Sequence, residues 1–186
     1  MIGYAICGSF CNFSSSLAVL EKLIGNGEEI QPIMSECAYG TDTRFWLASE
    51  FRDRVERLCG RPVIHKLADA EPLGPKRPLD AMIICPCTGN TLAKIACGIT
   101  DSVVTMAAKA HLRTDRPTLI ALASNDAMSQ NLKNLGGLIC RRNLYFVPMR
   151  QDDPIEKPHS LVADFGRLPQ ALDAMRQQKQ LRPLFI

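Results

Sequence analysis

Short apolar runs that alternate with amphipathic helical patterns constrain this chain more than any other feature. The runs at residues 2–7, 81–85 and 118–123 are almost entirely apolar, as strands are when both faces of a parallel sheet are covered. Helical patterns separate these runs, and strands joined through helices favour a parallel sheet. The sequence therefore predicts an α/β fold: a single doubly wound, Rossmann-like, three-layer domain over residues 1–186 with a mostly parallel sheet.

The other elements follow from the same periodicity. A helix with Leu17, Leu20 and Ile24 on one face should end at the glycines of residues 25–27. A second amphipathic helix is expected at 43–59, with one face inward and i,i+4 ion pairs on the outer face. The proline-rich segment 71–78 should be irregular. The inward residues are Leu47, Phe51, Val55 and Leu58, and the pairs are Glu50–Arg54 and Asp53–Arg57. Further helices are expected at about 92–97, at 101–111, up to 135 and at about 161–178, with strands at 30–34, near 138–140 and at 145–148.

Composition and charge exclude several classes of protein. Hydrophobic residues make up 46% and charged residues 22%, which is typical of a globular chain and not of a disordered chain, a fibre or a coiled coil. The net charge of +3, from 22 basic and 19 acidic residues, is too small for an electrostatic nucleic-acid binder. Residues 1–7 lack a signal-peptide pattern and no apolar run reaches the ~18–20 residues of a membrane span. We expect a soluble, cytoplasmic protein.

The eight cysteines do not have the pattern of a disulfide framework or a metal site. Cys7 and Cys85 lie inside apolar runs, and Cys97 and Cys140 fall in helical or strand patterns, so we expect most cysteines to be core residues in a reducing compartment. No Cys or His pair has zinc-site spacing, and a C-x-x-C motif is absent. The sequence predicts no metal.

Three loops that follow predicted strands carry the candidate site. In open sheets of this kind, ligands bind beyond the carboxyl ends of the strands. Gly8, Ser9 and Phe10 precede the first helix, where a glycine and free helix-start amides suit a phosphate. Ser35 ends the second strand and offers a hydroxyl. Each of these segments could equally be an ordinary capped turn.

The third loop, residues 86–91, is the most informative. It packs a glycine and four hydrogen-bonding side chains between a buried strand and a helix, while capping the helix needs only one such side chain. This density favours a polar ligand. The four side chains are those of Cys87, Thr88, Asn90 and Thr91.

These loops resemble those of the homo-oligomeric flavin-containing flavoprotein family, which includes cysteine decarboxylases and flavin prenyltransferases. The resemblance rests on Gly8-Ser9, Ser35, the segment from Pro86 to Ala96 and the segment 123–128, and covers nearly the whole chain. It implies FMN held by the loops between subunits of a trimer or of a dodecamer of trimers. The residues it assigns to FMN are Gly8, Ser9, Phe10, Ser35, Pro86, Cys87, Thr88, Asn90, Thr91 and Ser124.

Other segments are similar to one branch of that family. They are residues 70–75, 106–113, 146–154 and 157–161. The resemblance implies a subunit that works with a partner subunit in forming the pyridine dicarboxylate of bacterial spores, in the mother cell of a sporulating bacterium. It further implies oxidation of a dihydropyridine dicarboxylate, with NADP bound by the partner because no GxGxxG follows the first strand here.

The family's decarboxylases carry a Pro-Ala-Met-Asn-x-x-Met-Trp segment, of which Asn125 and Met128 remain here while the proline, the first methionine and the tryptophan are absent. His65 is separated from Pro86 by a proline-rich insertion and is expected to be a surface or locally bonded histidine. Both departures argue against a peptidyl-cysteine substrate. A decarboxylase of the phosphopantothenoylcysteine type, a flavin prenyltransferase and a non-catalytic flavin-binding subunit stay open as alternatives.

A dicarboxylate substrate requires cations or helix-start amides in its site. Lys109, His111 and Arg113 cluster at the end of a predicted helix, where solvated cations are also favoured. Lys109 and Arg113 share a face at i,i+4, a spacing at which like charges repel unless an anion lies between them. We expect Asn125, Met128, Lys109 and Arg113 to contact substrate, with Asn125 and Lys109 as candidate catalytic residues.

Overall fold

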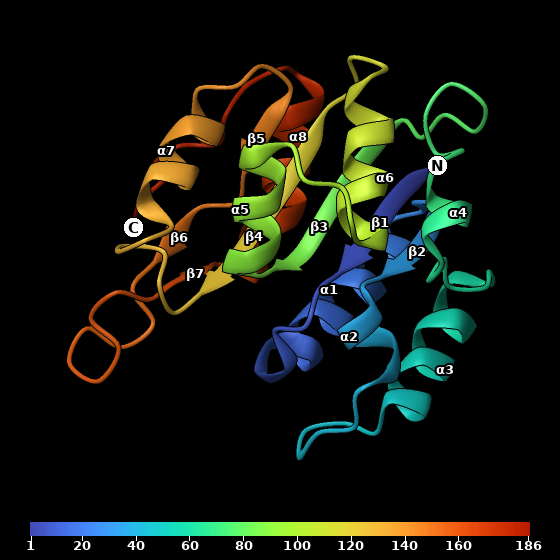
Figure 1. Cartoon of the computed structure of the whole chain (residues 1–186), viewed down its shortest axis with the longest axis horizontal. Coiled ribbons are helices and arrows are strands. Elements are labelled where there is room, and N and C mark those ends of the chain that lie inside the picture. Colours follow the sequence, from blue (N-terminus) through green and yellow to red (C-terminus); the bar gives the residue numbers. More distant parts are fainter.

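The computed structural model describes residues 1–186 as a seven-stranded sheet between two layers of helices (Figure 1). The strand order is β2-β1-β3-β4-β7-β6, and β5 pairs with the first half of β4. The strands are β1 (Ile2–Ile6), β2 (Ile30–Met34), β3 (Ala81–Cys87), β4 (Thr118–Ser124), β5 (Leu144–Phe146), β6 (Met149–Arg150) and β7 (Leu161–Ala163). The α-helices are α1 (Phe13–Gly25), α2 (Glu36–Gly40), α3 (Ala48–Cys59), α4 (Leu67–Ala70), α5 (Gly89–Cys97), α6 (Val103–Leu112), α7 (Leu132–Ile139) and α8 (Leu168–Arg176), with 3-10 turns η1 (Phe10–Asn12) and η2 (Phe165–Arg167).

The predicted doubly wound fold is confirmed. β1, β2, β3, β4 and β5 are parallel, while β7 pairs antiparallel with both β4 and β6. Every residue of β1, β3 and β4 is buried, as continuous apolar strands between two helical layers must be. None of the helices combines the length and the apolar character that crossing a membrane requires.

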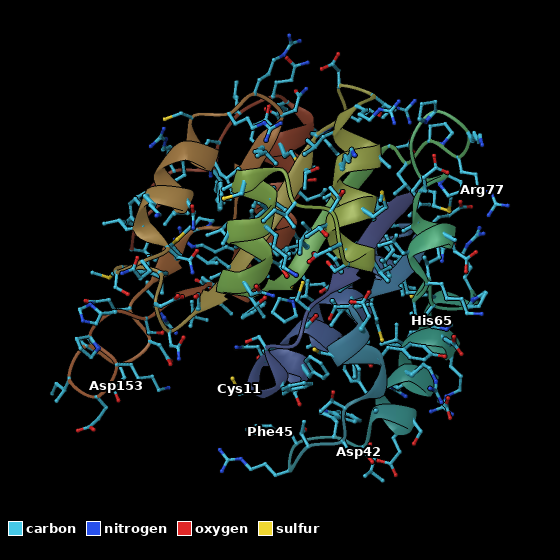
Figure 2. The ribbon with its side chains drawn as sticks, in the orientation of Figure 1. Cys11, Asp42, Phe45, His65, Arg77 and Asp153 are labelled. Atoms are coloured by element: carbon cyan, nitrogen blue, oxygen red, sulfur yellow. The ribbon has the colours of Figure 1, made fainter.

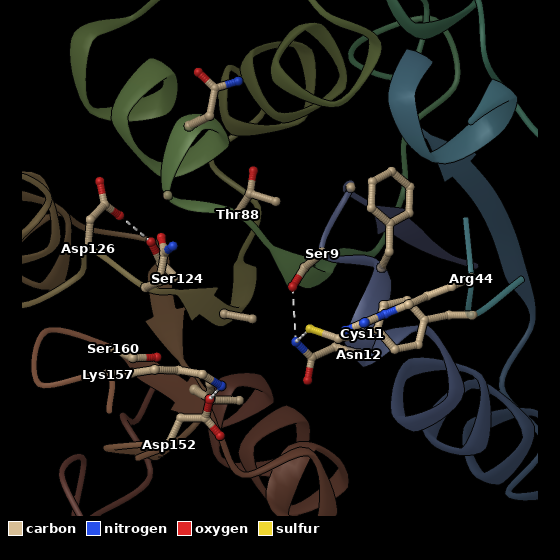
Figure 3. Close-up of a pocket in the computed structure, with 18 residues that line it drawn as sticks. Ser9, Cys11, Asn12, Arg44, Thr88, Ser124, Asp126, Asp152, Lys157 and Ser160 are labelled. Carbon is tan, nitrogen blue, oxygen red and sulfur yellow. Dashed lines mark hydrogen bonds and ion pairs between the residues drawn. The ribbon is translucent and has the colours of Figure 1, made fainter. Parts of the chain in front are cut away.

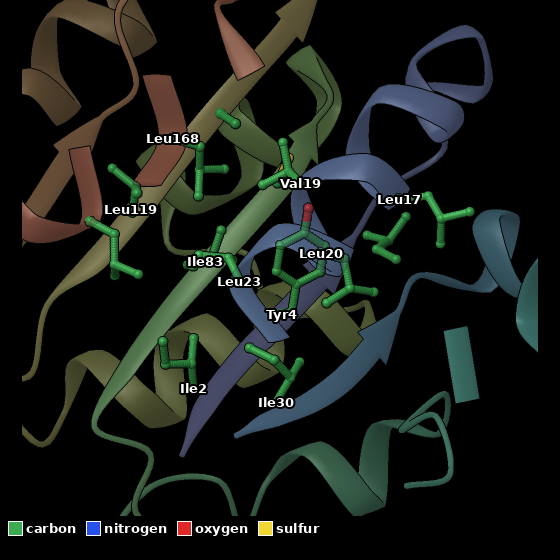
Figure 4. Packing of buried hydrophobic residues seen from close by; sticks show 14 of the residues in the cluster. Ile2, Tyr4, Leu17, Val19, Leu20, Leu23, Ile30, Ile83, Leu119 and Leu168 are labelled. Atoms are coloured by element: carbon green, nitrogen blue, oxygen red, sulfur yellow. The ribbon is translucent and has the colours of Figure 1, made fainter. Parts of the chain in front are cut away.

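Each face of the sheet has its own apolar core. On one face Tyr4 of β1 packs with Leu20 of α1 and Leu168 of α8 (Figure 4), and Phe51 of α3 belongs to the same cluster. On the other face Leu92, Val104 and the strand residues beneath them pack with α4, α5, α6 and α7. Helices therefore switch face between β1 and β3, and ligands of open sheets bind at such a switch point.

The helix predicted at 43–59 begins only at Ala48. Asp42 Oδ1 accepts the Ala48 N–H at 2.8 Å, so the preceding residues form a loop instead of a first turn. Leu47 is 49% exposed, which corrects its predicted inward position, whereas Phe51 and Val55 are buried and Leu58 is half-buried. The predicted i,i+4 ion pairs are replaced as well: Arg54 pairs with Glu21 of α1 at 2.6 Å, and Asp53 lies 3.8 Å from Arg52.

Two other boundaries also differ from prediction. Residues 138–140 do not form a strand, because Leu135 and Leu138 share the buried face of α7 at i,i+3. The last helix begins at Leu168 and not at 161, because Leu161 and Val162 pair with the end of β4 as strand β7. A strand of only three residues is too short to show an alternating pattern, so the sequence does not distinguish β7 from the first turn of a helix.

Most cysteines are not core residues, contrary to prediction. Cys7, Cys85 and Cys87 are buried in strands or at a strand end, Cys59 is half-buried, and the other four are exposed; all eight are free thiols. Burial raises the pKa of the Cys85 thiol to about 12, which makes it inert at neutral pH.

His111, unlike its neighbours Lys109 and Arg113, is fully buried. Its Nε2–H donates to the Pro117 carbonyl at 3.0 Å, and its Nδ1 has no hydrogen-bond partner. Burial lowers the pKa of His111 below its ordinary value, because the charged imidazolium would lose its water.

This histidine should make the fold acid-sensitive. Below a pH of about 6.5 the unfolded chain binds a proton at this residue that the folded chain does not, so the free energy of unfolding falls by at most about 1.4 kcal/mol per pH unit. In His111→Gln, where an amide can keep the bond to Pro117, this part of the slope should vanish. Urea unfolding at pH 5 to 8 measures it, with His159→Gln as the control that exchanges an exposed histidine. Identical slopes in His111→Gln and the unmodified chain would contradict the assignment.

Candidate functional site

A cavity of about 740 Å³ lies at the carboxyl ends of β1, β3 and β4, beside the amino end of the antiparallel strand β7 (Figure 3). Its volume is within the usual range of ligand sites, roughly 300–1,000 Å³. The loops after β1, β3 and β4 line it together with the loop before α3 and the loop between β6 and β7. The lining residues are Gly8, Ser9, Phe10, Cys11, Asn12, Arg44, Phe45, Thr88, Gly89, Asn90, Ala123, Ser124, Asn125, Asp126, Asp152, Lys157, Ser160 and Val162.

The loop after β1 forms one wall. The Asn12 Nδ2–H donates to Ser9 Oγ at 2.9 Å, and the Asn12 N–H donates to the Ser9 carbonyl at 2.9 Å, which closes a 3-10 turn ahead of α1. Gly8 passes close to α2, since a Cβ there would lie 3.3 Å from Cys37 Cβ. The turn therefore brings a hydroxyl, an amide and a stretch of backbone to the cavity, with the Phe10 ring beside Gly8.

The loop after β3 delivers the start of α5 to the cavity. Thr88 caps the helix, because its Oγ1 accepts the Thr91 N–H at 3.3 Å. Thr91 points inward, where its hydroxyl donates to Cys7 Sγ at 3.3 Å. The helix start carries positive partial charge and lies beside Asn90, so this wall suits anionic or hydrogen-bonding groups of a ligand.

The loop after β4 places a carboxylate against that helix start. Ser124 Oγ–H donates to Asp126 Oδ1, and the Asn131 Nδ2–H donates to Asp126 Oδ2 at 2.8 Å. The Ser124 hydrogen bond, with that of Asn131, lowers the pKa of Asp126 below its ordinary value, so the group is a carboxylate at neutral pH. The close contact of Asp126 and Ser124 with the start of α5 requires a glycine at position 89. A Cβ on Gly89 would lie 2.6 Å from Asp126 Oδ1 and 2.3 Å from Ser124 Oγ.

Two cations reach the cavity from segments without a predicted role. Lys157, on the loop between β6 and β7, pairs with Asp152 at 2.6 Å. Arg44, on the loop before α3, lies over the Phe45 ring at 4.8 Å and has no acidic partner. Figure 3 shows Lys157 and Arg44 on opposite sides of the cavity. Asp126 is therefore the one lining carboxylate that no cation neutralises.

The structure brings together seven of the predicted site residues. They are Gly8, Ser9, Phe10, Thr88, Asn90, Ser124 and Asn125. Four others do not line the cavity. Pro86 and Cys87 are buried in β3, Thr91 is buried in α5, and Ser35 accepts the Ala38 N–H at 3.3 Å as the cap of α2.

The remaining predicted residues lie elsewhere. Met128 lines a surface hollow near the C-terminus, and Lys109 and Arg113 line a separate cavity between α5 and α6. Because a helix that follows a parallel strand runs back along the sheet, the end of α6 lies at the amino ends of the strands. The order of strands and helices in the sequence could have indicated that Lys109 and Arg113 lie at the end of the sheet opposite the cavity.

Some lining residues that prediction missed, among them Asn12, Gly89 and Asp126, adjoin residues that it named. The others come mainly from two further loops. The polar segment Arg150-Gln151-Asp152-Asp153 is visible in the sequence, but its place over the cavity depends on the pairing of β6 with β7. Arg44 and Phe45 fall inside the segment predicted as helix, so no signal marked them.

His65 is locally bonded, as predicted. Its ring stacks on Tyr39 at a centroid distance of 3.9 Å, and its Nδ1 lies 3.3 Å from the Val63 carbonyl. Figure 2 shows His65 beside α3 and α4, away from Cys11 and Phe45 at the cavity. No three of the His, Cys, Asp and Glu side chains lie together in a way that could hold a metal ion.

Comparisons with known proteins agree with this geometry. Residues 1–166 match the family model described as "Flavoprotein". The chain is 40% identical over 185 residues to the B subunit of dipicolinate synthase from Bacillus subtilis, covering 100% of this chain and 92% of that protein. The crystal structure of the B subunit of dipicolinate synthase from Bacillus halodurans superposes with a TM-score of 0.91 at 37% identity, covering 100% of this chain and 95% of that one.

The fold extends to more distant enzymes. The FMN-dependent cysteine decarboxylase SpaF superposes with a TM-score of 0.70 at 23% identity, covering 95% of both chains. With a family model matched over most of its length, a full-length relative at 40% identity and the three-loop cavity of the fold in place, the chain belongs to the flavoprotein family.

Proposed function

We propose that this chain is the FMN-binding subunit of a dipicolinate synthase, which oxidises dihydrodipicolinate to dipicolinate during spore formation. The observation that carries the proposal is the cavity at the switch point of the sheet, where three polar loops and a helix start converge. The full-length likeness to the B subunit of dipicolinate synthase supplies the substrate class. A pyridine dicarboxylate needs cations, and the same cavity contains Arg44 and Lys157.

The cavity residues fit FMN. Phosphate suits the η1 turn and the start of α5, since both offer backbone amides beside a glycine. The side chains of Ser9, Thr88, Asn90 and Ser124 provide the donors and acceptors that ribityl hydroxyls and a flavin ring require. The lining combines these groups with Phe10 and Phe45, which offer apolar surface to a planar ring.

The reaction removes one hydride and one proton from the ring, and aromaticity of the product favours the loss. FMN, when bound, supplies a hydride acceptor. We assign proton acceptance to the Asp126 carboxylate, because Ser124 and Asn131 hold it in its charged form at the cavity wall. Two oxygens offer about four acceptor positions, so two hydrogen bonds leave Asp126 free to accept another.

The partner is proposed to be the A subunit of dipicolinate synthase. We propose that NADP binds to that partner subunit, because the turn after β1 in this chain lacks the GxGxxG pattern. The resemblance to the family also suggests a homo-oligomer, a trimer or a dodecamer of trimers, as the working form of this chain. It would act in the cytoplasm of the mother cell.

A half-reaction tests the proposal without the partner. The FMN-loaded chain is mixed anaerobically with dihydrodipicolinate, and the flavin absorbance near 450 nm is followed. We expect bleaching together with formation of dipicolinate in equal amount, and restoration of full turnover only when the partner and NADP are added. An FMN-loaded chain that stays oxidised, while the partner by itself forms dipicolinate at the full rate, would reduce this chain to a flavin-binding scaffold.

The two cavity cations should set affinity for the dicarboxylate. In Arg44→Gln and in Lys157→Gln we expect KM for dihydrodipicolinate to rise about tenfold each, as a lost charge-assisted hydrogen bond would give, with kcat changed far less. Lys157 has a competing partner in Asp152, so the effect at Arg44 should be the larger. Steady-state kinetics of the reconstituted enzyme measures both, with Arg52→Gln, a cation stacked on Tyr39 outside the cavity, as control. Equal KM values in all variants would place the substrate carboxylates elsewhere.

A further inference from the structure

A second cavity, of about 380 Å³, lies between the ends of α5, α6 and α7. It shares no lining residue with the first cavity. Figure 1 shows α5 and α6 side by side, with the end of α6 far from the carboxyl ends of the strands. The lining residues are Ile95, Gly98, Ile99, Thr100, Thr105, Ala108, Lys109, Leu112, Arg113 and Arg141.

Three cations converge on this cavity, and none has a partner. Lys109, Arg113 and Arg141 belong to no ion pair of the structure, and the lining contains no acidic residue. Lys109 and Arg113 lie on one face of α6 at i,i+4, where like charges destabilise a helix by a few tenths of a kcal/mol unless an anion lies between them. The arrangement therefore favours an anion.

The negative ends of three helices offset only part of this positive charge. α5, α6 and α7 all end at the cavity, and each C-terminus carries about half a negative charge. The three ends together carry about −1.5 charges against three positive side chains, which leaves an excess of about +1.5. Ligands with one and with two negative charges come equally near to balancing this excess, and three separate cations can contact both carboxylates of a dicarboxylate.

The floor of the cavity is apolar. Ile95 and Ala108 are buried and Leu112 is half-buried, and all three line the cavity with apolar side chains. Such a floor, with cations around it, suits a small ring that carries two carboxylates, and the volume is at the lower end of the range for small-molecule sites, roughly 300–1,000 Å³. The small volume favours a compact molecule over an extended acidic peptide.

We infer that this cavity is a second binding site, for a compact aromatic dicarboxylate, distinct from the flavin cavity. Lys109, Arg113 and Arg141 hold the carboxylates, and Ile95, Ala108 and Leu112 contact the ring. α5 joins the two cavities directly, since it begins at Gly89 in the first and ends beside Gly98 in the second. Only the choice of a pyridine ring for one of the probes rests on the proposed function.

Calorimetry with two probes tests the site in the FMN-loaded chain. The probes are benzene-1,3-dicarboxylate, which has no ring nitrogen, and pyridine-2,6-dicarboxylate. Titrations use a background in which Arg44 and Lys157 are both replaced by glutamine, so that carboxylate binding in the flavin cavity is weakened. We expect one dicarboxylate per chain, and a loss of affinity of about fivefold to tenfold in each of Lys109→Gln, Arg113→Gln and Arg141→Gln.

Arg142→Gln is the matched control, because Arg142 is exposed, follows Arg141 directly and does not line the cavity. It should leave affinity within about twofold, and benzoate, with one carboxylate, should bind at least about tenfold more weakly than the dicarboxylates. Thermal unfolding confirms that each variant is folded. Absence of dicarboxylate binding up to about 10 mM, an equal loss in Arg142→Gln, or a change in oligomeric state in place of a change in affinity would overturn the inference.

Failure of the chain to bind dicarboxylates in the second cavity would leave the proposed function intact, because that function depends on FMN reduction in the first cavity. Conversely, benzene-1,3-dicarboxylate binding that depends on Arg113 would support the second site even if dihydrodipicolinate failed to reduce the flavin.

Discussion

Replacing Asp126 by asparagine is expected to lower kcat for dihydrodipicolinate oxidation by about 10²–10⁴-fold, the usual contribution of a positioned base. Asparagine has nearly the same shape but cannot take up a proton. FMN affinity should change far less, because Ser9, Thr88 and Asn90 stay in place. Rapid-mixing measurements of flavin bleaching isolate the chemical step, and the same samples give the FMN dissociation constant by titration.

A second variant separates proton acceptance from a structural role of Asp126. The Ser124 hydroxyl is the main reason that the pKa of Asp126 is low, so Ser124→Ala should raise that pKa and move the acidic limb of the pH–rate profile to higher pH. The protein should remain active at pH 8. Turnover of Asp126→Asn within about threefold of the unmodified chain, or an acidic limb that Ser124→Ala does not move, would remove Asp126 from the mechanism.

Gly89→Ala should damage both the fold and FMN binding. An added Cβ would lie 2.3 Å from Ser124 Oγ, 2.6 Å from Asp126 Oδ1 and 2.7 Å from Asn131 Nδ2. Ser124 and Asn131 are almost fully buried and cannot yield easily, so the start of α5 must shift. We expect a loss of about 1–3 kcal/mol in the free energy of unfolding, the usual cost of overpacking, measured by urea denaturation.

The same shift displaces Thr88 and Asn90 from the cavity wall, so FMN should bind at least tenfold more weakly, an effect of about 1.4 kcal/mol. Gly136→Ala is the matched control: it also lies within a helix, and a Cβ there meets nothing within 4 Å. That exchange should stabilise the chain by about 0.5–1 kcal/mol, since alanine favours the helix, and leave FMN binding unchanged. If Gly89→Ala had the same stability and FMN affinity as Gly136→Ala, the start of α5 would not contact the ligand.

Local sequence predicted the central strands and two of the loops that line the cavity, those after β1 and β3, because fully apolar strands and polar strand ends are visible along the chain. The predicted loop at Ser35 does not line the cavity, and Ser124 in the loop after β4 was assigned only by the family resemblance. β2 was predicted with its observed bounds, and the loop from Pro86 to Thr91 was identified by its density of polar groups. A buried parallel strand must be apolar throughout, so its pattern needs no knowledge of its neighbours.

What could not be predicted depends on contacts between distant segments. The Asp42 carboxylate accepts the Ala48 N–H and so shifts the start of α3, and β7 forms by pairing with both β4 and β6. These two pairings place the loop that carries Lys157 over the cavity. The carboxylate at Asp126 gains its role from Asn131 and from the absence of a side chain at Gly89, neither of which a local pattern shows.

The central claim is that the cavity binds FMN, and titration of the chain with FMN tests it most directly. Trp46 is the only tryptophan; it follows Phe45 in the cavity wall, and its indole N–H donates to Ser14 Oγ at 3.2 Å, so its fluorescence reports on this site. We predict uptake of one FMN per chain with quenching of Trp46 fluorescence, and an affinity for FMN at least tenfold weaker in Gly89→Ala but unchanged in Gly136→Ala. A chain that contains no flavin when purified, and leaves both FMN absorbance and Trp46 fluorescence unchanged on mixing, would contradict the account.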